Sequence, residues 1–411
     1  MSALATSFQQ RFDEIKALGL TIDMTRGKPC SEQLDLSNDM LNGVGSNGYK
    51  TRNGTDTRNY GGMAGIDEAR ELMGGLIGVE PANTIAFGNS SLTIMYHYLM
   101  AALYPTIETL KAAGKTARFL APSPGYDRHF WICEKLGLEM LLVPFTAEGP
   151  DVAVCRQLMA EHDNVMGIWC VPKHSNPTGH TYSDAVVDGI SQLPKLAKGP
   201  FVVMWDNAYG VHDLSDTAAP LANMREISKA NGTEDGVAIF GSTSKITLAG
   251  AGIGAAGLST VNFKMFEKYL GVQSIGPDKI NQLVHAKFFS GGRTVASHMK
   301  RHAAILKPKF DAVLAGLESE LGGMANVSWT KPEGGYFISL YAIPGTAGAV
   351  VAMAKELGVA LTPAGAAFPK GKDARDTHIR IAPSCPALEE IATACEVITL
   401  CVKLAAKRPT T

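Results

Sequence analysis

The chain has 411 residues, of which 45% are hydrophobic and 19% are charged, and its formal net charge is −1. These proportions are typical of a globular enzyme and exclude a disordered or fibrous chain. The length favours two domains, and the near-neutral charge gives no reason to expect a nucleic-acid or acidic-lipid partner.

The N-terminal segment 1–20 contains Arg11, Asp13, Glu14 and Lys16, so it lacks the uninterrupted apolar core of a signal peptide. No segment has the length and apolarity of a membrane span. The cysteines are scattered, with no C-x-x-C pair and no zinc-like cluster with histidine, which is typical of reduced thiols in the cytosol. They are Cys30, Cys133, Cys155, Cys170, Cys385, Cys395 and Cys401. We therefore expect a cytoplasmic protein without a membrane segment or a metal site.

From about residue 60, helical stretches alternate with short apolar runs. The expected strands are 118–121, 140–143, 165–171, 201–205 and 237–240, and the expected helices are 90–103, 127–136, 152–161 and 183–193. This alternation predicts an α/β fold, with a mainly parallel sheet that helices cover on both faces.

After Gly291-Gly292 the pattern changes. A long helix at 294–321, strands within 327–341 and helices at 347–357 and 387–403 predict a smaller α+β unit. The segment before residue 50 is too short to fold alone, so we expect it to join that unit. The predicted division is a large domain at 51–293 and a small domain made of 1–50 and 294–411.

Two helix starts carry candidate binding residues. The apolar run at 86–88 passes into a helix through Asn89, Ser90 and Ser91. A helix N-terminus offers free N–H groups and a positive dipole end to an anion, and the hydroxyls add donors; either serine also suits an ordinary N-cap. Tyr126, in Pro124-Gly125-Tyr126, suits either stacking on a flat heterocycle or core packing.

Two expected strands end in polar residues. Asn176 stands in the turn Asn176-Pro177-Thr178-Gly179 after the strand 165–171, at the edge where open α/β sheets bind ligands. Asp206 follows the apolar strand 201–205, and a carboxylate there costs solvation free energy unless it meets a cation. A protonated pyridine nitrogen is such a cation, and an Asp beneath it keeps the ring of pyridoxal phosphate an electron sink. Tyr209 follows closely and suits a donor to the phenolate oxygen of that ring.

Lys245 follows the strand 237–240 in Gly241-Ser242-Thr243-Ser244-Lys245, and a loop rich in glycine and alanine comes next. A lysine at the mouth of a strand, between hydroxyls and small residues, suits an amine that forms a Schiff base beside a bound phosphate. A lone lysine in such a turn is more often a surface residue, and the motif at Asp206 is what favours the functional interpretation.

The order and spacing of these motifs closely resemble those of the fold-type-I pyridoxal-phosphate aminotransferases, class I/II, from Arg26 to Arg380. The resemblance implies that the catalytic residues are Lys245, which forms the Schiff base, Asp206, which pairs with the pyridinium nitrogen, and Tyr209. It implies that Asn176 and Tyr209 hold the ring oxygen and that Tyr126 stacks on the ring. The residues implied to bind the phosphate of pyridoxal 5'-phosphate are Ser90, Ser91, Ser242 and Ser244.

The resemblance also implies how substrate and partner are bound. Tyr60, in Arg58-Asn59-Tyr60-Gly61-Gly62, matches the tyrosine that family members lend to the neighbouring subunit, which implies a homodimer with shared active sites. Arg380, in Ile379-Arg380-Ile381, matches the arginine that grips the substrate α-carboxylate, and a guanidinium fork fits a carboxylate through two parallel hydrogen bonds. A surface salt bridge is the alternative for this arginine.

Two departures resemble a divergent branch of aspartate aminotransferases. The loop at 250–254 lacks the arginine that many relatives place near the phosphate, and the stretch at 271–277 lacks the arginine that reads the distal carboxylate. The run Arg26-Gly27-Lys28-Pro29 stands where relatives line the substrate mouth, so we expect Arg26 or Lys28 to read that carboxylate. Transamination between L-aspartate and 2-oxoglutarate is the expected reaction.

Other functions stay open at this stage. An aminotransferase specific for alanine or aromatic substrates and a β-lyase use the same cofactor-binding residues. The run at 252–257 satisfies G-x-G-x-x-G and suggests an NAD-dependent oxidoreductase with Asp278 on the ribose, but that motif should follow directly on a strand and open a helix. A DNA-binding regulator with an aminotransferase-like domain needs a basic head, for which the chain before Tyr60 is too short.

Overall fold

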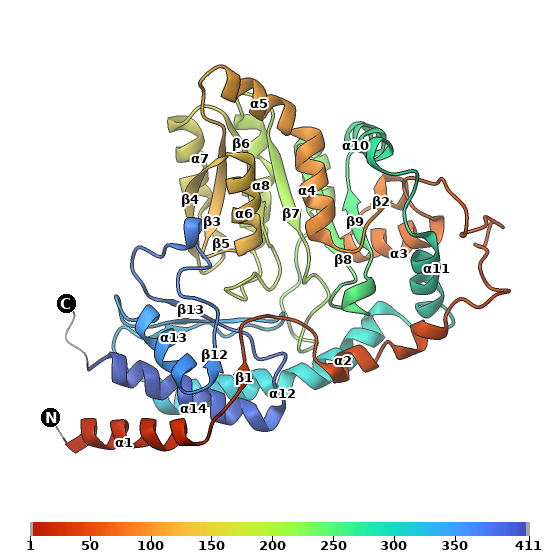
Figure 1. Cartoon of the computed structure of the whole chain (residues 1–411). Coiled ribbons are helices and arrows are strands. Elements are labelled where there is room, and N and C mark those ends of the chain that lie inside the picture. The colour runs from red at the N-terminus through yellow and green to blue at the C-terminus, as the bar shows by residue number, and fades with distance from the viewer. Residues whose placement is uncertain (1–2, 408–411) are drawn as a thin grey trace.

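The computed structural model describes residues 3–407, and its centre is an eight-stranded sheet (Figure 1). The strand order is β2-β9-β8-β7-β6-β3-β4-β5. The parallel strands are β3 (Arg118–Ser123), β4 (Glu139–Thr146), β6 (Val165–Cys170), β7 (Val202–Asp206) and β8 (Val237–Ser242). The strands β2 (Thr84–Ala86), β5 (Gly149–Pro150) and β9 (Gly254–Gly257) pair antiparallel with their neighbours. The prediction of a mainly parallel sheet is confirmed.

Helices cover both faces of this sheet because its central strands are apolar on both sides. In β7, Val203 and Trp205 belong to one buried cluster, whereas Val202 and Met204 belong to another on the opposite face. The helices α3 (Asp67–Ile77), α7 (Val152–Glu161), α8 (Asp184–Ser191) and α9 (Met224–Ala230) supply the first cluster. The helices α4 (Ser91–Ala102), α5 (Tyr104–Ala112), α6 (Asp127–Leu136) and α10 (Thr260–Gln273) supply the second.

Strand β9 differs from the sequence-based expectation, which treated 252–257 as part of a loop or as a dinucleotide motif. Its residues Gly-Ala-Ala-Gly are small because neighbouring segments pack directly on the strand. A Cβ on Gly257 would lie 2.5 Å from Val79 Cγ2, and one on Gly254 would lie 2.6 Å from the Ser90 carbonyl oxygen. The G-x-G-x-x-G run therefore ends in a strand instead of opening a helix. The structural context that a dinucleotide-binding oxidoreductase requires is not met.

A second region lies below the large sheet in Figure 1 and combines both ends of the chain. Its three-stranded antiparallel sheet has the order β10 (Ser328–Trp329), β11 (Ile338–Tyr341) and β13 (His378–Ile381). The N-terminal strand β1 (Ile22–Asp23) pairs in parallel with β12 (Val359–Ala360). The helices of this region are α1 (Ala3–Ala17), α2 (Ser31–Asp35), α12 (Val295–Leu321), α13 (Ala347–Glu356) and α14 (Leu388–Ala405).

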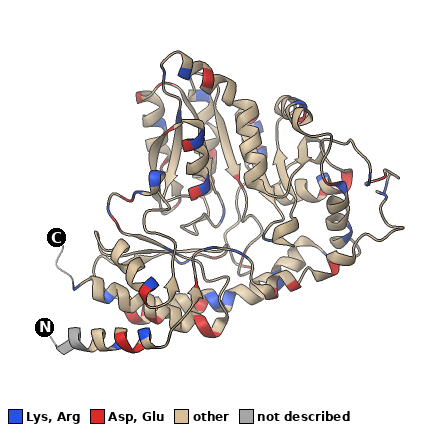
Figure 2. Cartoon of the chain, viewed as in Figure 1, with Lys and Arg blue, Asp and Glu red and all other residues tan. Residues whose placement is uncertain are grey.

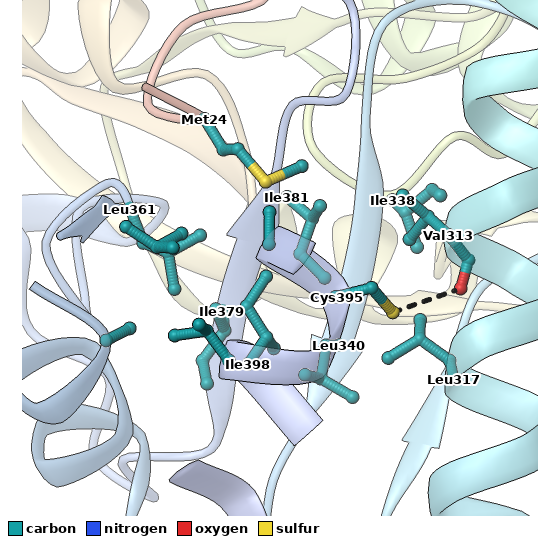
Figure 3. Close-up of a cluster of buried hydrophobic side chains, with 14 of the residues drawn as sticks. Met24, Val313, Leu317, Ile338, Leu340, Leu361, Ile379, Ile381, Cys395 and Ile398 are labelled. Atoms are coloured by element: carbon teal, nitrogen blue, oxygen red, sulfur yellow. Dashed lines mark hydrogen bonds between the residues drawn. The ribbon is translucent and has the colours of Figure 1, made fainter. Parts of the chain in front are cut away.

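The core of this region joins side chains that are distant in the sequence (Figure 3). Met24, after β1, is fully buried among side chains from α12, β11, β13 and α14. Cys395 in α14 donates to the carbonyl oxygen of Val313 in α12 at 3.7 Å. The N-terminal segment is thus packed on the C-terminal one, while the division at residues 50 and 293 stays a prediction.

Helix α11 (Lys279–Phe288) and six short 3-10 helices complete the described residues. The latter are Asn38–Asn42, Pro81–Asn83, Leu193–Leu196, Glu234–Gly236, Ala249–Ala251 and Pro369–Gly371. Figure 2 shows that basic and acidic residues are distributed over both regions. Between residues 3 and 407, none of the helices combines the length and the apolarity needed to cross a membrane.

Candidate active site

The predicted site residues meet at one edge of the large sheet. Asp206 is the last residue of β7 and Ser242 is the last residue of β8, and these strands run parallel with Asp206 opposite Phe240. Tyr126 follows β3 and Asn176 follows β6, at the same carboxyl-terminal edge. The sheet topology alone therefore gathers these four side chains from four separate stretches of sequence.

Asp206 is held from one side and free on the other. The carboxylate is 2% exposed, and its Oδ2 lies 3.2 Å from Nε2 of His129, while its buried Oδ1 has no hydrogen-bond partner among the described residues. The His129 ring is stacked on Trp169 with 4.0 Å between centroids and 7° between planes. A buried carboxylate oxygen without a partner costs free energy unless a ligand donor meets it, so this oxygen fits a ring N–H.

The sequence did not point to His129, although its position offered a signal. His129 comes three residues after Tyr126, at the start of α6, and the two rings make an edge-to-face contact at 4.9 Å. An i, i+3 pair lies on one face of a helix, so a histidine at this spacing from a candidate stacking residue belongs with the site.

Lys245 faces the two candidate tyrosines. Its Nζ lies 4.9 Å from the ring centroid of Tyr209. Burial raises the pKa of Tyr209 above its ordinary value, and the Asp206 carboxylate adds to this, while the charge of Arg380 and a hydrogen bond with Asn176 act in the opposite direction. Burial likewise raises the pKa of Tyr126 to about 12, against the nearby charge of Lys245. Both phenols are therefore neutral donors at neutral pH.

The serines lie around the N-terminus of α4. Ser90 caps that helix by accepting from the Thr93 N–H at 3.3 Å, and Ser91 is its first residue. Ser244 Oγ donates to the Asn89 carbonyl at 3.0 Å, which ties the lysine turn to this helix start. A Cβ on Gly252 would lie 2.7 Å from the same carbonyl oxygen, so the glycine permits the close approach. The first-turn N–H groups, the helix dipole and these hydroxyls have the chemistry that suits an anion.

Arg380 is buried, and only some of its N–H groups have hydrogen-bond partners among the described residues. It is 8% exposed, its Nη1 donates to Asn176 Oδ1 at 3.2 Å, and its Nη2 donates to the Thr25 carbonyl and to Thr362 Oγ1 at 3.2 and 3.1 Å. Its buried Nε–H has no partner among the described residues. Burial lowers the pKa of this guanidinium, and Asp127 opposes that effect. The remaining N–H capacity fits a carboxylate ligand.

The segment Arg26-Gly27-Lys28 passes beside Arg380. A Cβ on Gly27 would lie 2.5 Å from the Phe337 ring, and that ring lies under the Arg380 guanidinium at 5.0 Å. The side chains of Arg26 and Lys28 are exposed and form no ion pair within residues 3–407. The backbone is therefore fixed at the site, while both cations are free to meet a ligand.

Tyr60 is separate from the other predicted residues within one chain. Tyr60 is 80% exposed, and the segment before α3 forms the loop at the right of Figure 1. The buried Lys279 donates to the carbonyls of Asn59 and Gly61, on either side of Tyr60, at 2.6 Å each. The loop is thus held in place with its tyrosine directed away from the protein.

The chain matches a family model over its whole length. The model is that of the aspartate amino-transferase family, and it matches residues 1–411. The aspartate aminotransferase of Corynebacterium glutamicum is 41% identical over 401 residues, which cover 97% of this chain and 92% of that protein. A Mycolicibacterium smegmatis protein, whose name gives no substrate, is 45% identical over 403 residues, covering 97% of this chain and 94% of that protein.

Solved structures extend the similarity to the fold. The crystal structure of an aspartate transaminase from C. glutamicum has a TM-score of 0.91 at 40% identity and covers 98% of this chain and 95% of that one. An α-aminoadipate aminotransferase from Thermus thermophilus, solved with N-(5'-phosphopyridoxyl)-L-leucine, has a TM-score of 0.76 at 20% identity and covers 96% of this chain and 95% of that one. The latter likeness shows the fold alone.

Proposed function

Because the chain belongs to the aspartate amino-transferase family and is therefore an aminotransferase, we propose that it transfers the amino group of L-aspartate to 2-oxoglutarate, giving oxaloacetate and L-glutamate. One observation carries the proposal: the amine of Lys245, together with an oxygen of Asp206 and an N–H of Arg380 that have no partner among residues 3–407, surrounds the buried Tyr209. The name of the C. glutamicum relative supports aspartate as the donor.

The residues present fit pyridoxal 5'-phosphate as the cofactor. The free Oδ1 of Asp206 suits the pyridinium N–H, and Asn176 and Tyr209 suit the ring oxygen. Tyr126 lies edge-on to His129 at the end of β3 and suits stacking on the ring. The residues proposed for the phosphate are Ser90, Ser91, Ser242 and Ser244. When bound, this cofactor supplies an electron sink for carbanion chemistry, and the protein supplies orientation and charge.

The roles of the protein groups follow from their contacts. Lys245 Nζ holds the cofactor and then serves as the base that takes a proton from the substrate Cα, a task that typically contributes about 10²–10⁴-fold. Arg380 grips the α-carboxylate and fixes the orientation of Cα relative to Nζ. Asp206 lies beneath the site, and His129 fixes the direction of its carboxylate.

The distal carboxylate of the substrate requires a second cation. Arg26 and Lys28 are exposed, unpaired within residues 3–407 and attached to a backbone that packs on Phe337 beside Arg380. We propose that one of them reads this carboxylate, with Gly27 allowing the close approach. An alanine or aromatic specificity, or a β-lyase reaction, needs no such cation, so the two residues also distinguish these alternatives.

We further propose a homodimer with shared active sites. Tyr60 is 80% exposed, and Ile275, whose carbonyl accepts from the Gly61 N–H at 3.2 Å, is 67% exposed beside it. Val272, at the end of α10, is 87% exposed. Apolar side chains exposed together on a fixed loop fit a second copy of the chain, and Tyr60 then lies at the partner's phosphate.

We also propose that residues 51–293 form the large domain and that 1–50 with 294–411 form the small one.

A donor panel tests the reaction. Purified enzyme is mixed with single amino acids without an acceptor, and loss of the visible cofactor absorbance is recorded for each. The proposal expects aspartate and glutamate to react fastest, with alanine and phenylalanine far slower. If only alanine or an aromatic amino acid reacts rapidly, that amino acid and not aspartate is the donor. Release of ammonia with pyruvate would favour the β-lyase.

A further inference from the structure

The turn that carries Lys245 is largely buried, with Thr243, Ile246 and Thr247 covered, and some of its backbone carbonyls depend on donors from other segments. Residues 243–247 form one turn after β8, and the chain then enters the short helix Ala249–Ala251. The carbonyls of Lys245 and Ile246 therefore lack the partners that a continuing α-helix would give them. Buried carbonyls need donors, and here side chains from distant segments provide them.

His285, in α11, holds the two ends of this turn. Its Nδ1 donates to the Asn281 carbonyl at 2.9 Å, which leaves Nε2 as an acceptor. The hydroxyls of Thr243 and Thr247 lie 3.1 and 2.9 Å from that Nε2. Thr243 Oγ1 also accepts from the Ile253 N–H at 2.9 Å. One imidazole thus connects the beginning and the end of the lysine turn.

Two further histidines donate to the middle of the turn. His212, after β7, donates from Nε2 to the Lys245 carbonyl at 3.3 Å. His298, in the first part of α12, donates from Nε2 to the Ile246 carbonyl at 2.8 Å. All three histidines are at most 3% exposed. They come from three separate segments of the chain, namely the stretch after β7, helix α11 and helix α12.

His302 contacts His298, and Gln33 in turn contacts His302. The Nε2 of His302, one turn further along α12, lies 3.1 Å from Nε2 of His298. Gln33 Nε2 lies 2.9 Å from Nδ1 of His302 and donates to Tyr336 Oη at 2.9 Å. Helix α2, which carries Gln33, runs beside α12 beneath the large sheet (Figure 1). The contacts therefore connect the N-terminal segment with the lysine turn.

We propose that His212, His285 and His298 are positioning residues that clamp the backbone of the Lys245 turn and thereby orient its amine for reaction. The inference rests on the proposed role of Lys245. A clamp of this kind matters because Lys245 Nζ is at the end of a flexible chain of methylenes, whose direction depends on a fixed Cα–Cβ bond. Misplacing a reacting group by about 1 Å can cost on the order of 100-fold in rate.

Burial keeps the three imidazoles of the clamp in their neutral form. Burial lowers the pKa of each of the three imidazoles, to about 3 for His212, where the charge of Lys245 contributes as well. Neutral imidazoles keep the N–H groups that His212 and His298 donate and the Nε2 acceptor of His285, without placing further positive charge against the lysine.

The test compares His298→Leu, which removes the donor, with His298→Gln, whose side-chain amide keeps a donor at similar reach. In the holoenzyme, we expect His298→Leu to accelerate amide hydrogen exchange of residues 244–248 about tenfold or more. We also expect it to shift the pH midpoint of the visible cofactor absorbance by about half a unit, and to lower kcat about 10- to 100-fold with KM little changed. His298→Gln should restore all three quantities towards wild type.

The control is His97→Leu, which removes a half-buried imidazole of α4 that has no hydrogen bond to the lysine turn. It should leave the absorbance midpoint and the exchange of residues 244–248 unchanged. If His298→Leu fails to fold, His212→Leu and His212→Gln replace the pair. A folded His298→Leu with wild-type exchange and midpoint overturns the clamp, as does a glutamine variant as defective as the leucine one. A wild-type protein without any chromophore would instead refute the proposed function.

Discussion

Nε2 of His129 lies 3.2 Å from Oδ2 of Asp206, and the other, buried carboxylate oxygen has no hydrogen-bond partner in the part of the chain that the structure describes. Both side chains are almost fully buried, and the histidine is itself fixed by stacking on Trp169. A carboxylate with one oxygen fixed and one free presents a single direction to a ligand, which is what a ring N–H requires.

Replacing His129 by leucine should lower turnover without abolishing it. Hydrogen bonds to charged groups contribute about 1.5–3 kcal/mol, so we expect kcat/KM to fall about 10- to 100-fold. Steady-state kinetics with a cofactor-saturated enzyme measure this effect. The control is Arg128→Ala, because the neighbouring Arg128 packs its guanidinium over the Trp131 ring, and this variant should have little effect. Equal losses in both variants would contradict the role given to His129.

Replacing Asp206 by alanine should be far more damaging. The ring nitrogen then loses its counter-charge, so the enzyme should bind the cofactor weakly and lose nearly all turnover even when cofactor is added in excess. Cofactor titration by absorbance and activity at saturation separate the two effects. The control is Asp213→Ala, whose carboxylate instead pairs with Lys173 and His174. Substantial residual activity of Asp206→Ala at saturating cofactor would refute the electron-sink role.

Replacing Arg380 by alanine should weaken the binding of both the amino acid and the 2-oxo acid. Two charge-assisted hydrogen bonds of about 1.5–3 kcal/mol each are lost, so kcat/KM should fall about 10²–10⁴-fold while the cofactor spectrum persists. Arg375→Ala, an exposed arginine on the approach to the same strand, is the matched control. Similar kinetics for the Arg380 variant and wild type would leave the α-carboxylate without its proposed partner.

Replacing Arg26 and Lys28 separately by alanine should identify the reader of the distal carboxylate. One of the two variants should lose its preference for aspartate over alanine by about 10-fold or more, because only the dicarboxylic donor uses the second cation. The measurement is the ratio of kcat/KM for the two donors. If the ratio is unchanged in both variants, another residue reads this carboxylate.

Stability should decline as the pH falls below about 6.5. Burial lowers the pKa of His212 and His378 to about 3 and that of His302 to about 4. The unfolded chain binds protons at these positions below its ordinary pKa of about 6.5, whereas the folded chain does not, so acid favours unfolding. Each histidine then removes about 1.4 kcal/mol per pH unit between about pH 6.5 and its folded pKa.

Urea unfolding at several pH values between 7.5 and 4.5 measures this slope. Glu80 and Asp56, whose folded pKa values are lowered to about 2, add to this slope only towards the lower limit of the range, where the unfolded chain begins to protonate them. His378→Gln should reduce the slope by about one proton's share, that is about 1.4 kcal/mol per pH unit. A flat stability profile between pH 6.5 and 4.5 would show that these imidazoles are protonated in the folded protein.

The sequence by itself determined the chemistry-bearing motifs and most of the elements that carry them. Helices at 127–136 and 152–161 were predicted with the bounds that the structure has, because caps and hydrophobic periodicity are local signals. Asp206 and Lys245 were identifiable for the same reason, since each follows an apolar strand and belongs to a short, recognisable run.

Only the tertiary structure decided which side chains share the site and what supports them. Strand β9 is made of glycine and alanine, whose strand propensity is low, and it forms because β2 and β8 lie on either side of it. The partners of the lysine turn, His212, His285 and His298, come from positions whose local sequence carries no sign of the contact. Such contacts depend on packing between distant segments, which local propensity does not encode.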